Sequence, residues 1–396
     1  MQNTSRMNFD VPNVDWIKCK VATLLLALIS VGTMCGPGAT PVSGDEPASK
    51  TMRFKWSSLP DLPNDLGVAG PFVGVHNDAL IVAGGANFPL PVWDSQKAWT
   101  DQIWVLRKAE RGMQWLSGGD LLKPLAYGAA VSTELGVVCI GGNDANRLYR
   151  EVFTLQWDST SQKVIRTDLP SLRVPFAYGQ ATVIDKVLYV AGGQSGPQLE
   201  SAMNQLWSLD LSQQSESVND PANNQSGLSW RELPAIPSSV RAFNITAQQD
   251  NGEETCVYVI GGRFQRNDQA VFLSEVWEFS PKHQAWRRRA DAPRPISAGT
   301  GIGVGQNDIL VLSGDDGALF TQTEQLKDQH PGFRKEALCF NAKTNTWSSA
   351  GTTPQNQVTT NAVLWDDRIL LPSGEIRPRV RTPAVWSIER SSADER

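Results

Sequence analysis

The feature that most constrains the fold of this chain is a pattern that recurs six times: a short apolar run that ends in two small residues. The steps between successive copies are 57, 51, 69, 52 and 60 residues. This spacing is close to the period of about 50 residues that is typical of kelch-type repeats. The small pairs begin at Gly84, Gly141, Gly192, Gly261, Ser313 and Ser373.

Each copy has the same neighbours along the chain. A strand-like run precedes it, such as Gly179–Ile184, and a run of alternating bulky and smaller residues follows it, such as Gln205–Leu209. Alternation of this kind has the period of a half-buried strand. A fourth strand carries a Trp shortly before a Leu or Pro in five units, and Ile165 takes its place in the other. Four antiparallel strands at this period predict an all-β, six-bladed kelch-type β-propeller over residues 51–390.

The two ends of this region complement each other. The C-terminal unit ends at about Ile388 without its Trp-bearing strand, whereas Phe54–Pro60 supplies such a strand before the first full unit. We therefore predict that the N-terminal strand completes the C-terminal blade. This arrangement closes the ring and leaves no open sheet edge between the first and last blades.

The first fifty residues differ from the rest. Lys18 and Lys20 precede an apolar run, Val21–Val31, and small or turn-forming residues follow it. This order is typical of a secretory signal peptide, and the run is short of the roughly 20 residues that span a bilayer. We predict that residues 1–50 are a leader, that residues 391–396 are a polar tail, and that the protein is periplasmic or secreted with no stable membrane span after leader removal. A retained membrane anchor is the alternative.

Composition excludes several classes of function. Lys plus Arg number 36 and Asp plus Glu 41, a net charge of −5, which argues against a nucleic-acid partner. Only 3 His are present, and Asp315 and Asp316 lack a partner at ligand spacing, so we predict no metal and no cofactor. Three cysteines lie in apolar strands and are predicted to be small buried hydrophobic residues. They are Cys139, Cys256 and Cys339.

The strongest candidate for chemistry is the segment Gly374–Thr382, between the second and third strands of the last blade. Glu375 directly follows a strand, and Arg381 lies six residues further on. A carboxylate can take and return a proton, and an Arg can hold an anionic group by a two-pronged contact. The alternative is a Glu–Arg ion pair that only fixes the loop.

Further candidates come from loops predicted to emerge on the same face as this segment. Arg, Tyr and Asn suit polyhydroxy or carboxylate ligands, so we predict that these residues bind substrate; the alternative is that each caps its own loop. Those between consecutive blades are Arg173, Arg241, Tyr127 and Tyr178. Those between second and third strands are Asn87, Asn143 and Arg263.

Several of these segments resemble a known family. Gly67–Gly85, Ala126–Gly128 and the Gly374–Thr382 loop are similar to the bacterial N-acetylneuraminate epimerases, the sialic acid mutarotases. The resemblance extends from about Trp56 to Ile388 in rotated order, as in the cyclically permuted mutarotase group. A closed ring with neighbouring termini permits such a permutation.

The resemblance implies roles for individual residues. Glu375 matches the proposed proton-accepting glutamate, Arg381 the proposed active-site arginine, and Arg241 a further arginine of the family. The implied reaction interconverts the α and β anomers of N-acetylneuraminate by proton removal from the anomeric hydroxyl, ring opening and reclosure, without a cofactor. The implied partner is a small-molecule sugar of the sialic acid type. Ile376 and Arg377 depart from the family's loop, which leaves another sugar acid or a neutral sugar open.

Two other functions compete with this one. A propeller can also bind a glycan or a protein without catalysis, because a fold does not determine function. A copper-radical sugar oxidase is disfavoured by the few His and by the lack of an evident Cys–Tyr pair at the channel mouth.

Overall fold

The fold is built almost entirely from strands. The computed structural model describes residues 54–213 and 227–391; the predicted leader, and the predicted tail apart from Ser391, lie outside the described residues. Within those ranges no helix has the length and apolar character needed to cross a membrane. The helical segments are η1 (Leu199–Ser201), η2 (Leu211–Gln213), η3 (Phe320–Gln322), α1 (Thr323–Leu326) and η4 (Lys327–Gln329).

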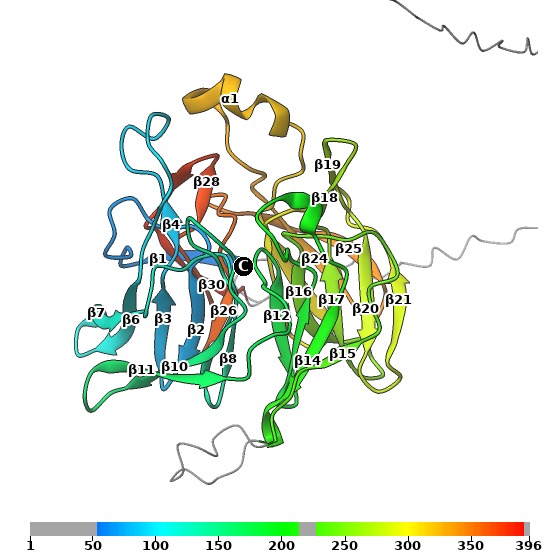
Figure 1. Cartoon of the computed structure of the whole chain (residues 1–396), viewed down its shortest axis with the longest axis horizontal. Helices are drawn as coiled ribbons and strands as arrows, with labels where there is room; N and C mark the ends of the chain where they lie inside the picture. Colours follow the sequence, from blue (N-terminus) through cyan, green and yellow to red (C-terminus); the bar gives the residue numbers. More distant parts are fainter. Residues whose placement is uncertain (1–53, 214–226, 392–396) are drawn as a thin grey trace, which may run out of the picture. The chain divides into compact units, whose positions relative to one another are not determined.

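Six four-stranded antiparallel sheets form the six blades, numbered here from the first complete sheet in the chain (Figure 1). The strands of blades 1 to 3 are β2 (Phe72–His76), β3 (Ala79–Ala83), β6 (Gln102–Ala109) and β7 (Gly112–Asp120); β8 (Ala129–Thr133), β9 (Gly136–Ile140), β10 (Val152–Asp158) and β11 (Lys163–Leu169); and β12 (Gln180–Ile184), β13 (Val187–Ala191), β14 (Leu206–Asp210) and β15 (Arg231–Leu233). Those of blades 4 to 6 are β16 (Ile245–Asp250), β17 (Thr255–Ile260), β20 (Val276–Ser280) and β21 (Ala285–Arg289); β22 (Thr300–Val304), β23 (Asp308–Leu312), β24 (Glu336–Asn341) and β25 (Thr346–Thr352); and β26 (Val363–Trp365), β27 (Arg368–Pro372), β30 (Val385–Arg390) and β1 (Phe54–Leu59). The prediction of a six-bladed β-propeller is confirmed.

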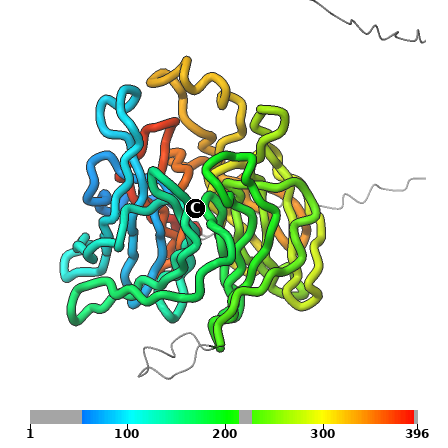
Figure 2. Tube along the Cα trace, viewed as in Figure 1, coloured from blue at the N-terminus to red at the C-terminus, as the bar shows by residue number. Residues whose placement is uncertain are grey.

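The ring closes as the two ends of the repeat region predict. β1 pairs antiparallel with β30, from Phe54 opposite Arg390 to Leu59 opposite Val385. The first described strand, blue in Figure 2, is therefore the outer strand of the blade that ends the chain in red. Apolar side chains of consecutive blades pack against each other, so the core is a series of layers between the sheets. The three predicted cysteines are buried within these layers.

The small pairs lie where the second strand of each blade ends. The first residue of each pair is left-handed, with φ of 63° at Gly141. A Cβ on Gly141 would lie 2.1 Å from the carbonyl oxygen of Phe176, in the loop that leads into blade 3, so only Gly fits there. Ser373 holds the same conformation, with φ of 54°. Its hydroxyl contacts the backbone N–H of Val68 at 2.8 Å and the carbonyl of Thr382 at 2.8 Å, which joins blade 6 to blade 1.

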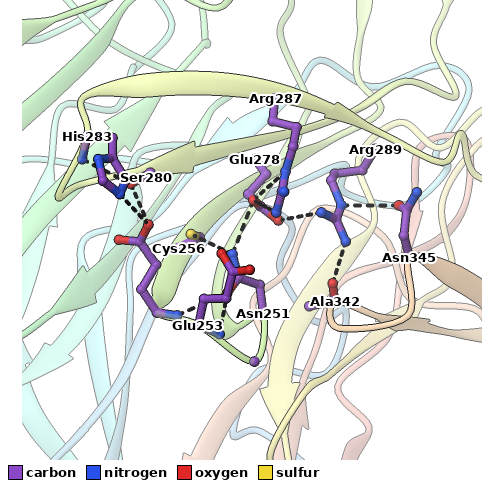
Figure 3. A network of polar contacts seen from close by, with 12 residues as sticks. Asn251, Glu253, Cys256, Glu278, Ser280, His283, Arg287, Arg289, Ala342 and Asn345 are labelled. Carbon is purple, nitrogen blue, oxygen red and sulfur yellow. Dashed lines mark hydrogen bonds and ion pairs between the residues drawn. The ribbon is translucent and has the colours of Figure 1, made fainter.

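Blades 4 and 5 share a buried cluster of charges, shown in Figure 3. Glu278 of β20 is 3% exposed and pairs with Arg287 at 2.6 Å and with Arg289 at 3.3 Å. Arg289 also donates to the carbonyl of Ala342 and, at 3.1 Å, to the side chain of Asn345, both in blade 5. Because Arg289 contacts Glu278 in blade 4 and also Ala342 and Asn345 in blade 5, the cluster joins the two blades. Each of the buried charges Glu278 and Arg289 thereby has a partner.

Three hairpins and one helical loop extend the same end of the sheets. Each lies between the second and third strands of its blade, in blades 1, 4, 6 and 5 respectively. In Figure 1, β4, the β18–β19 hairpin, β28 and α1 all stand beyond that end. The hairpin strands are β4 (Ala86–Asn87) and β5 (Ala98–Trp99), β18 (Arg263–Arg266) and β19 (Gln269–Phe272), and β28 (Glu375–Arg377) and β29 (Val380–Arg381).

Candidate active site

A closed ring of backbone hydrogen bonds surrounds the central channel. In each blade, a residue two to four positions before the first strand has a left-handed conformation, with φ between 53° and 65°. The N–H of each donates to the carbonyl oxygen of its counterpart in the preceding blade, at 2.5 to 2.8 Å. Five of the six carry a side chain, and left-handed backbone costs such residues about 1 kcal/mol or more each. The six are Gly70, Tyr127, Tyr178, Phe243, Ala298 and Thr359.

The side chains of this ring divide the channel mouth into two halves. The rings of Tyr127 and Tyr178 lie 4.9 Å apart, and those of Tyr178 and Phe243 lie 4.7 Å apart. We call these three residues the aromatic ledge. The other half carries only Ala298, Thr359 and Gly70, which leaves room above it. An aromatic surface beside an open space suits a sugar ring, which has apolar C–H faces and polar edges.

A second set of six equivalent residues lies directly after the small pairs. Each forms a β-bridge with the residue that precedes a member of the hydrogen-bonded ring. Four of the six carry a side chain that lines a cavity at the channel mouth. The six are Ala86, Asn143, Gln194, Arg263, Asp315 and Glu375. The repeat therefore brings Glu375 and Arg263, both predicted site residues, to equivalent positions around one axis.

The cavity at this mouth has a volume of about 910 Å³, enough for a sugar acid. Its lining includes the aromatic ledge and Lys97 from the loop between β4 and β5. It also includes four charged side chains described below: Glu375, Arg381, Arg263 and Asp315. Five of the predicted site residues thus lie together: Glu375, Arg381, Arg263, Tyr127 and Tyr178.

Glu375 and Arg381 lie opposite each other on the β28–β29 hairpin. Arg381 Nη1 donates to Glu375 Oε1 at 3.2 Å, and the backbone N–H of Arg379 donates to the same oxygen at 2.8 Å. Arg381 also donates from Nε to the carbonyl of Ala86 at 3.3 Å and from Nη2 to the hydroxyl of Tyr127 at 3.4 Å. Among the described residues, nothing donates a hydrogen bond to Glu375 Oε2. The pair is therefore both a loop-fixing ion pair and a carboxylate held with one oxygen free at a cavity.

Burial shapes the electrostatics of this pair. The Arg381 side chain is 2% exposed and that of Glu375 is 16% exposed. Burial by itself lowers the pKa of Arg381, but the charge of Glu375 and the contact with Tyr127 outweigh it and raise that pKa. Arg381 therefore stays a cation throughout the physiological pH range.

Arg263 lies in a box of aromatic rings. Its guanidinium carbon is 4.0 Å from the ring centre of Phe243, 5.1 Å from that of Phe320 and 5.5 Å from that of Phe272. Its nearest acidic neighbour is Asp315, with Oδ2 3.8 Å from Nη1. Burial lowers the pKa of Arg263, and the charges of Asp315 and Glu375 oppose this. Burial also raises the pKa of Asp315.

Four predicted site residues do not line the cavity. Asn143 is buried and donates from Nδ2 to the hydroxyl of Tyr178 at 2.8 Å, so it orients the aromatic ledge from behind. Burial raises the pKa of Tyr178, which keeps that hydroxyl protonated. Asn87 donates to the carbonyl of Gly67 at 3.1 Å and so ties the β4–β5 hairpin to the segment that precedes β2. Arg173 is exposed at the surface and is not among the described residues that line the cavity.

Arg241 lies furthest from the predicted arrangement. Its side chain is 0% exposed and lies between blades 3 and 4, where Nη2 meets Glu275 Oε2 at 2.8 Å and Nη1 donates to the carbonyl of Gly261 at 3.1 Å. The sequence predicts the loop that carries Arg241 but not the side of the backbone to which its side chain points. Its described contacts are those of a residue that joins two blades, and the substrate-binding role stays a prediction.

The sequence prediction omitted other lining residues. Gln194 follows a Gly pair, the same repeat position as Arg263 and Glu375, so the repeat contains the signal that could have found it. Asp315 occupies this position too but was considered only as a cation ligand. Lys97 lies 4.9 Å above the Tyr127 ring, and His330 reaches the cavity from the loop that contains α1. These last two lie in blade-specific insertions, which no repeat predicts.

The helical loop of blade 5 is tied to the hairpin that carries the site. Arg379 Nη2 lies 3.2 Å from a carboxylate oxygen of Glu324, and Arg377 Nη2 lies 3.0 Å from one of Asp328. All four side chains are at least 31% exposed, so each pair contributes about 1 kcal/mol or less. These contacts hold the loop beside the site without locking it there.

The fold and the site define a six-bladed β-propeller with an acidic and several basic side chains around a cavity at one end of its channel. No family model matches the chain. It is 34% identical over 141 residues to N-acetylneuraminate epimerase of Brucella suis, and 22% identical over 244 residues to the protein of the same name from Salmonella typhi. These alignments span 35% and 58% of the two relatives, and 30% and 56% of this chain. The resemblance to N-acetylneuraminate epimerases is confirmed.

A solved structure described as "Structure of YjhT" is similar in fold. The TM-score is 0.59 at 12% sequence identity, over 84% of this chain and 99% of that one. At this identity the likeness supports the six-bladed architecture alone.

Proposed function

We propose that the protein is a mutarotase that interconverts the α and β anomers of N-acetylneuraminate or a closely related sugar acid. The observation that carries the proposal is Glu375, a carboxylate fixed by two hydrogen bonds through Oε1, with Oε2 left free at a cavity of sugar size. The names of the relatives support the choice of sugar. The alignments span only 35% and 58% of these relatives' length, so the activity is a proposal for this chain.

The proposed reaction needs one group that moves a proton. Glu375 Oε2 takes the proton of the anomeric hydroxyl while the bond between the anomeric carbon and the ring oxygen breaks. The anomeric C–O bond becomes a carbonyl, and Glu375 passes the same proton to the ring oxygen. Rotation about the adjacent carbon–carbon bond and reversal of these steps give the other anomer. No atom or electron is gained or lost, so the reaction requires no cofactor.

Arg381 keeps Glu375 ready for this role. Its three contacts, with Glu375, Ala86 and Tyr127, hold the guanidinium in one place, and the ion pair keeps the carboxylate on the cavity side of the hairpin. General acid–base catalysis of this kind contributes about 10²–10⁴-fold to a rate. That factor is useful because the reaction in water is already appreciable.

The test is NMR of freshly released α-N-acetylneuraminate with and without the full chain. Faster appearance of the β anomer is expected, and Glu375→Gln should remove about 10²–10⁴-fold of the catalysed rate, since the amide oxygen is a far weaker base. Glu389→Gln, the same change at a partly exposed position on β30 of blade 6, should leave the rate unaltered. A full rate in Glu375→Gln contradicts the assigned role. Ligand binding without acceleration favours the non-catalytic glycan-binding propeller instead.

We also propose that the protein acts outside the cytoplasm. The support is the order of charged, apolar and small residues in the first fifty positions of the sequence. Cell fractionation of the full-length protein with antibody detection tests this, and a purely cytoplasmic location contradicts it.

A further inference from the structure

We infer that Arg263, and not Arg381, binds the carboxylate of the substrate and so makes the site specific for sugar acids over neutral sugars. The inference rests on the proposed function for the identity of the ligand. It rests on the structure for the choice between the two arginines.

The nitrogens of Arg381 are already engaged. Nε, Nη1 and Nη2 each donate to a different protein oxygen, on Ala86, Glu375 and Tyr127. To bind a substrate carboxylate by a two-pronged contact, Arg381 would have to release Glu375 or Tyr127. Releasing Glu375 would free the carboxylate that the reaction needs in a fixed position.

The guanidinium of Arg263 is in the opposite condition. Among the described residues, no oxygen accepts a hydrogen bond from it, and its Nε is buried without a partner. Only 17% of the side chain is exposed, and it lines the cavity. A buried donor without an acceptor is costly, and a carboxylate that accepts two N–H groups removes that cost. The structure therefore presents a preformed, unfilled receptor for a planar anion.

The surroundings of Arg263 fix its orientation. Phe243 lies against the guanidinium plane at 4.0 Å, and Phe320 and Phe272 complete the box. Because aromatic rings attract the cation without accepting conventional hydrogen bonds, they leave its N–H groups available for an oxygen acceptor. A cation held in this way loses little further freedom when it binds an anion, which favours affinity.

The charge balance of the cavity matches one negative charge. Its lining has four cationic side chains and three anionic ones, an excess of one positive charge. His330 does not add to it, because burial lowers its pKa. The cationic residues are Lys97, Arg263, Arg379 and Arg381, and the anionic ones are Asp268, Asp315 and Glu375. A monoanionic sugar neutralises this excess.

The position of Arg263 also suits the chemistry at Glu375. In N-acetylneuraminate the carboxylate is bonded directly to the anomeric carbon, so its receptor and the proton acceptor must face the same small volume. Arg263 and Glu375 occupy equivalent positions of the repeat in blades 4 and 6, with Asp315 between them, and all three line one cavity. A carboxylate on Arg263 would bring the anomeric hydroxyl toward the open half of the mouth, where Glu375 lies.

The test separates binding from turnover. The probes are the α and β methyl glycosides of N-acetylneuraminate, which cannot open their ring, and the methyl esters of the same glycosides, which lack the carboxylate charge. Affinities for the full chain are measured by calorimetry or ligand-observed NMR. Arg263→Gln should weaken binding of the acid glycoside about 10- to 100-fold and leave binding of the ester nearly unchanged, because only the acid uses the charged fork.

Two further variants control for structural damage. Arg263→Lys keeps the charge without the fork and should recover part of the affinity for the acid. Arg266→Gln changes the same charge on the exposed side of the same hairpin and should have no effect. The inference is overturned if Arg263→Gln weakens acid and ester equally, if it weakens neither, or if the wild-type protein binds neither acid glycoside. If the acid binds through Arg263 but anomers do not interconvert faster, the proposed function fails and the carboxylate receptor stands.

Discussion

Replacement of Arg241 by methionine distinguishes a structural arginine from a substrate-binding one. The side chain is fully buried, with one ionic hydrogen bond of 2.8 Å to Glu275 and one of 3.1 Å to the carbonyl of Gly261. Methionine fills most of the same volume but makes neither contact. We therefore expect Arg241→Met to lower the stability of the fold and to leave ligand affinity unchanged.

The magnitude follows from the contacts. Both hydrogen bonds are donated by the charged guanidinium, and each contributes about 1.5–3 kcal/mol before the cost of burying that charge. Part of this lost free energy is recovered, because methionine has no charge whose burial costs free energy. That cost is also what lowers the pKa of Arg241. The net loss is about 2–4 kcal/mol in the free energy of unfolding, or about 3–6 °C in Tm for a domain of this size.

The assay pairs calorimetric unfolding with binding of the acid methyl glycoside. Arg231→Met, which removes an exposed arginine from β15 in the neighbouring blade, is the matched control and should change stability by less than about 0.5 kcal/mol. An unchanged Tm together with a large loss of affinity in Arg241→Met would refute the structural assignment. It would restore the substrate-binding role that the sequence suggests.

Three other changes have defined outcomes. Burial alone would raise the pKa of Glu275, but its hydrogen bonds and the charge of Arg241 lower it to about 2 from 4.5. The stability that Glu275 contributes is therefore complete above pH 4.5 and is lost as the pH falls through 2, so acid titration of unfolding should be shallower in Glu275→Gln. Tyr178→Ala removes the middle of the aromatic ledge and should weaken sugar binding about 3- to 10-fold in calorimetry, whereas Tyr178→Phe should retain affinity. Glu278→Gln takes the carboxylate partner from the buried Arg289 and from the exposed Arg287, and should lower the free energy of unfolding by about 3–5 kcal/mol in denaturant titration without altering KM.

Each of these predictions has a contrary result. Equal acid sensitivity of wild-type protein and Glu275→Gln would show that other carboxyls control acid unfolding. Equal sugar affinity in Tyr178→Ala would show that the ligand does not rest on the aromatic ledge. A neutral effect of Glu278→Gln would show that the arginines of the cluster find other acceptors.

The fold could be predicted because each blade repeats the same local rules. The left-handed pair after the second strand is Gly-Gly or Ser-Gly in each blade, so it recurs visibly in the sequence, and the complementary ends show how the ring closes. Glu375 and Arg381 were also within reach, because a hairpin of seven residues must bring its two ends together. These features depend on short-range geometry, which sequence spacing describes well.

The rest of the site depends on the direction of side chains and on contacts between blades. Arg241, Arg173 and Asn87 lie in the right loops, but their side chains point between blades, to the surface or to the segment before β2, respectively. The unfilled state of Arg263 depends on rings from blades 4 and 5 that are far apart in the sequence. Comparing equivalent repeat positions, as Gln194 shows, recovers part of this information from the sequence.

The pairing of β1 with β30 also determines when the protein can finish folding. As the chain leaves the ribosome, blades 1 to 5 can form one after another, since each is continuous in the sequence. The strand Phe54–Leu59 emerges first among them, yet its partner Val385–Arg390 emerges last. Until then β1 is an unpaired edge of the last blade, and blade 6 lacks two of its four strands. Native contacts at such separation in the sequence slow folding, so closure of the ring has to wait for the end of the described chain.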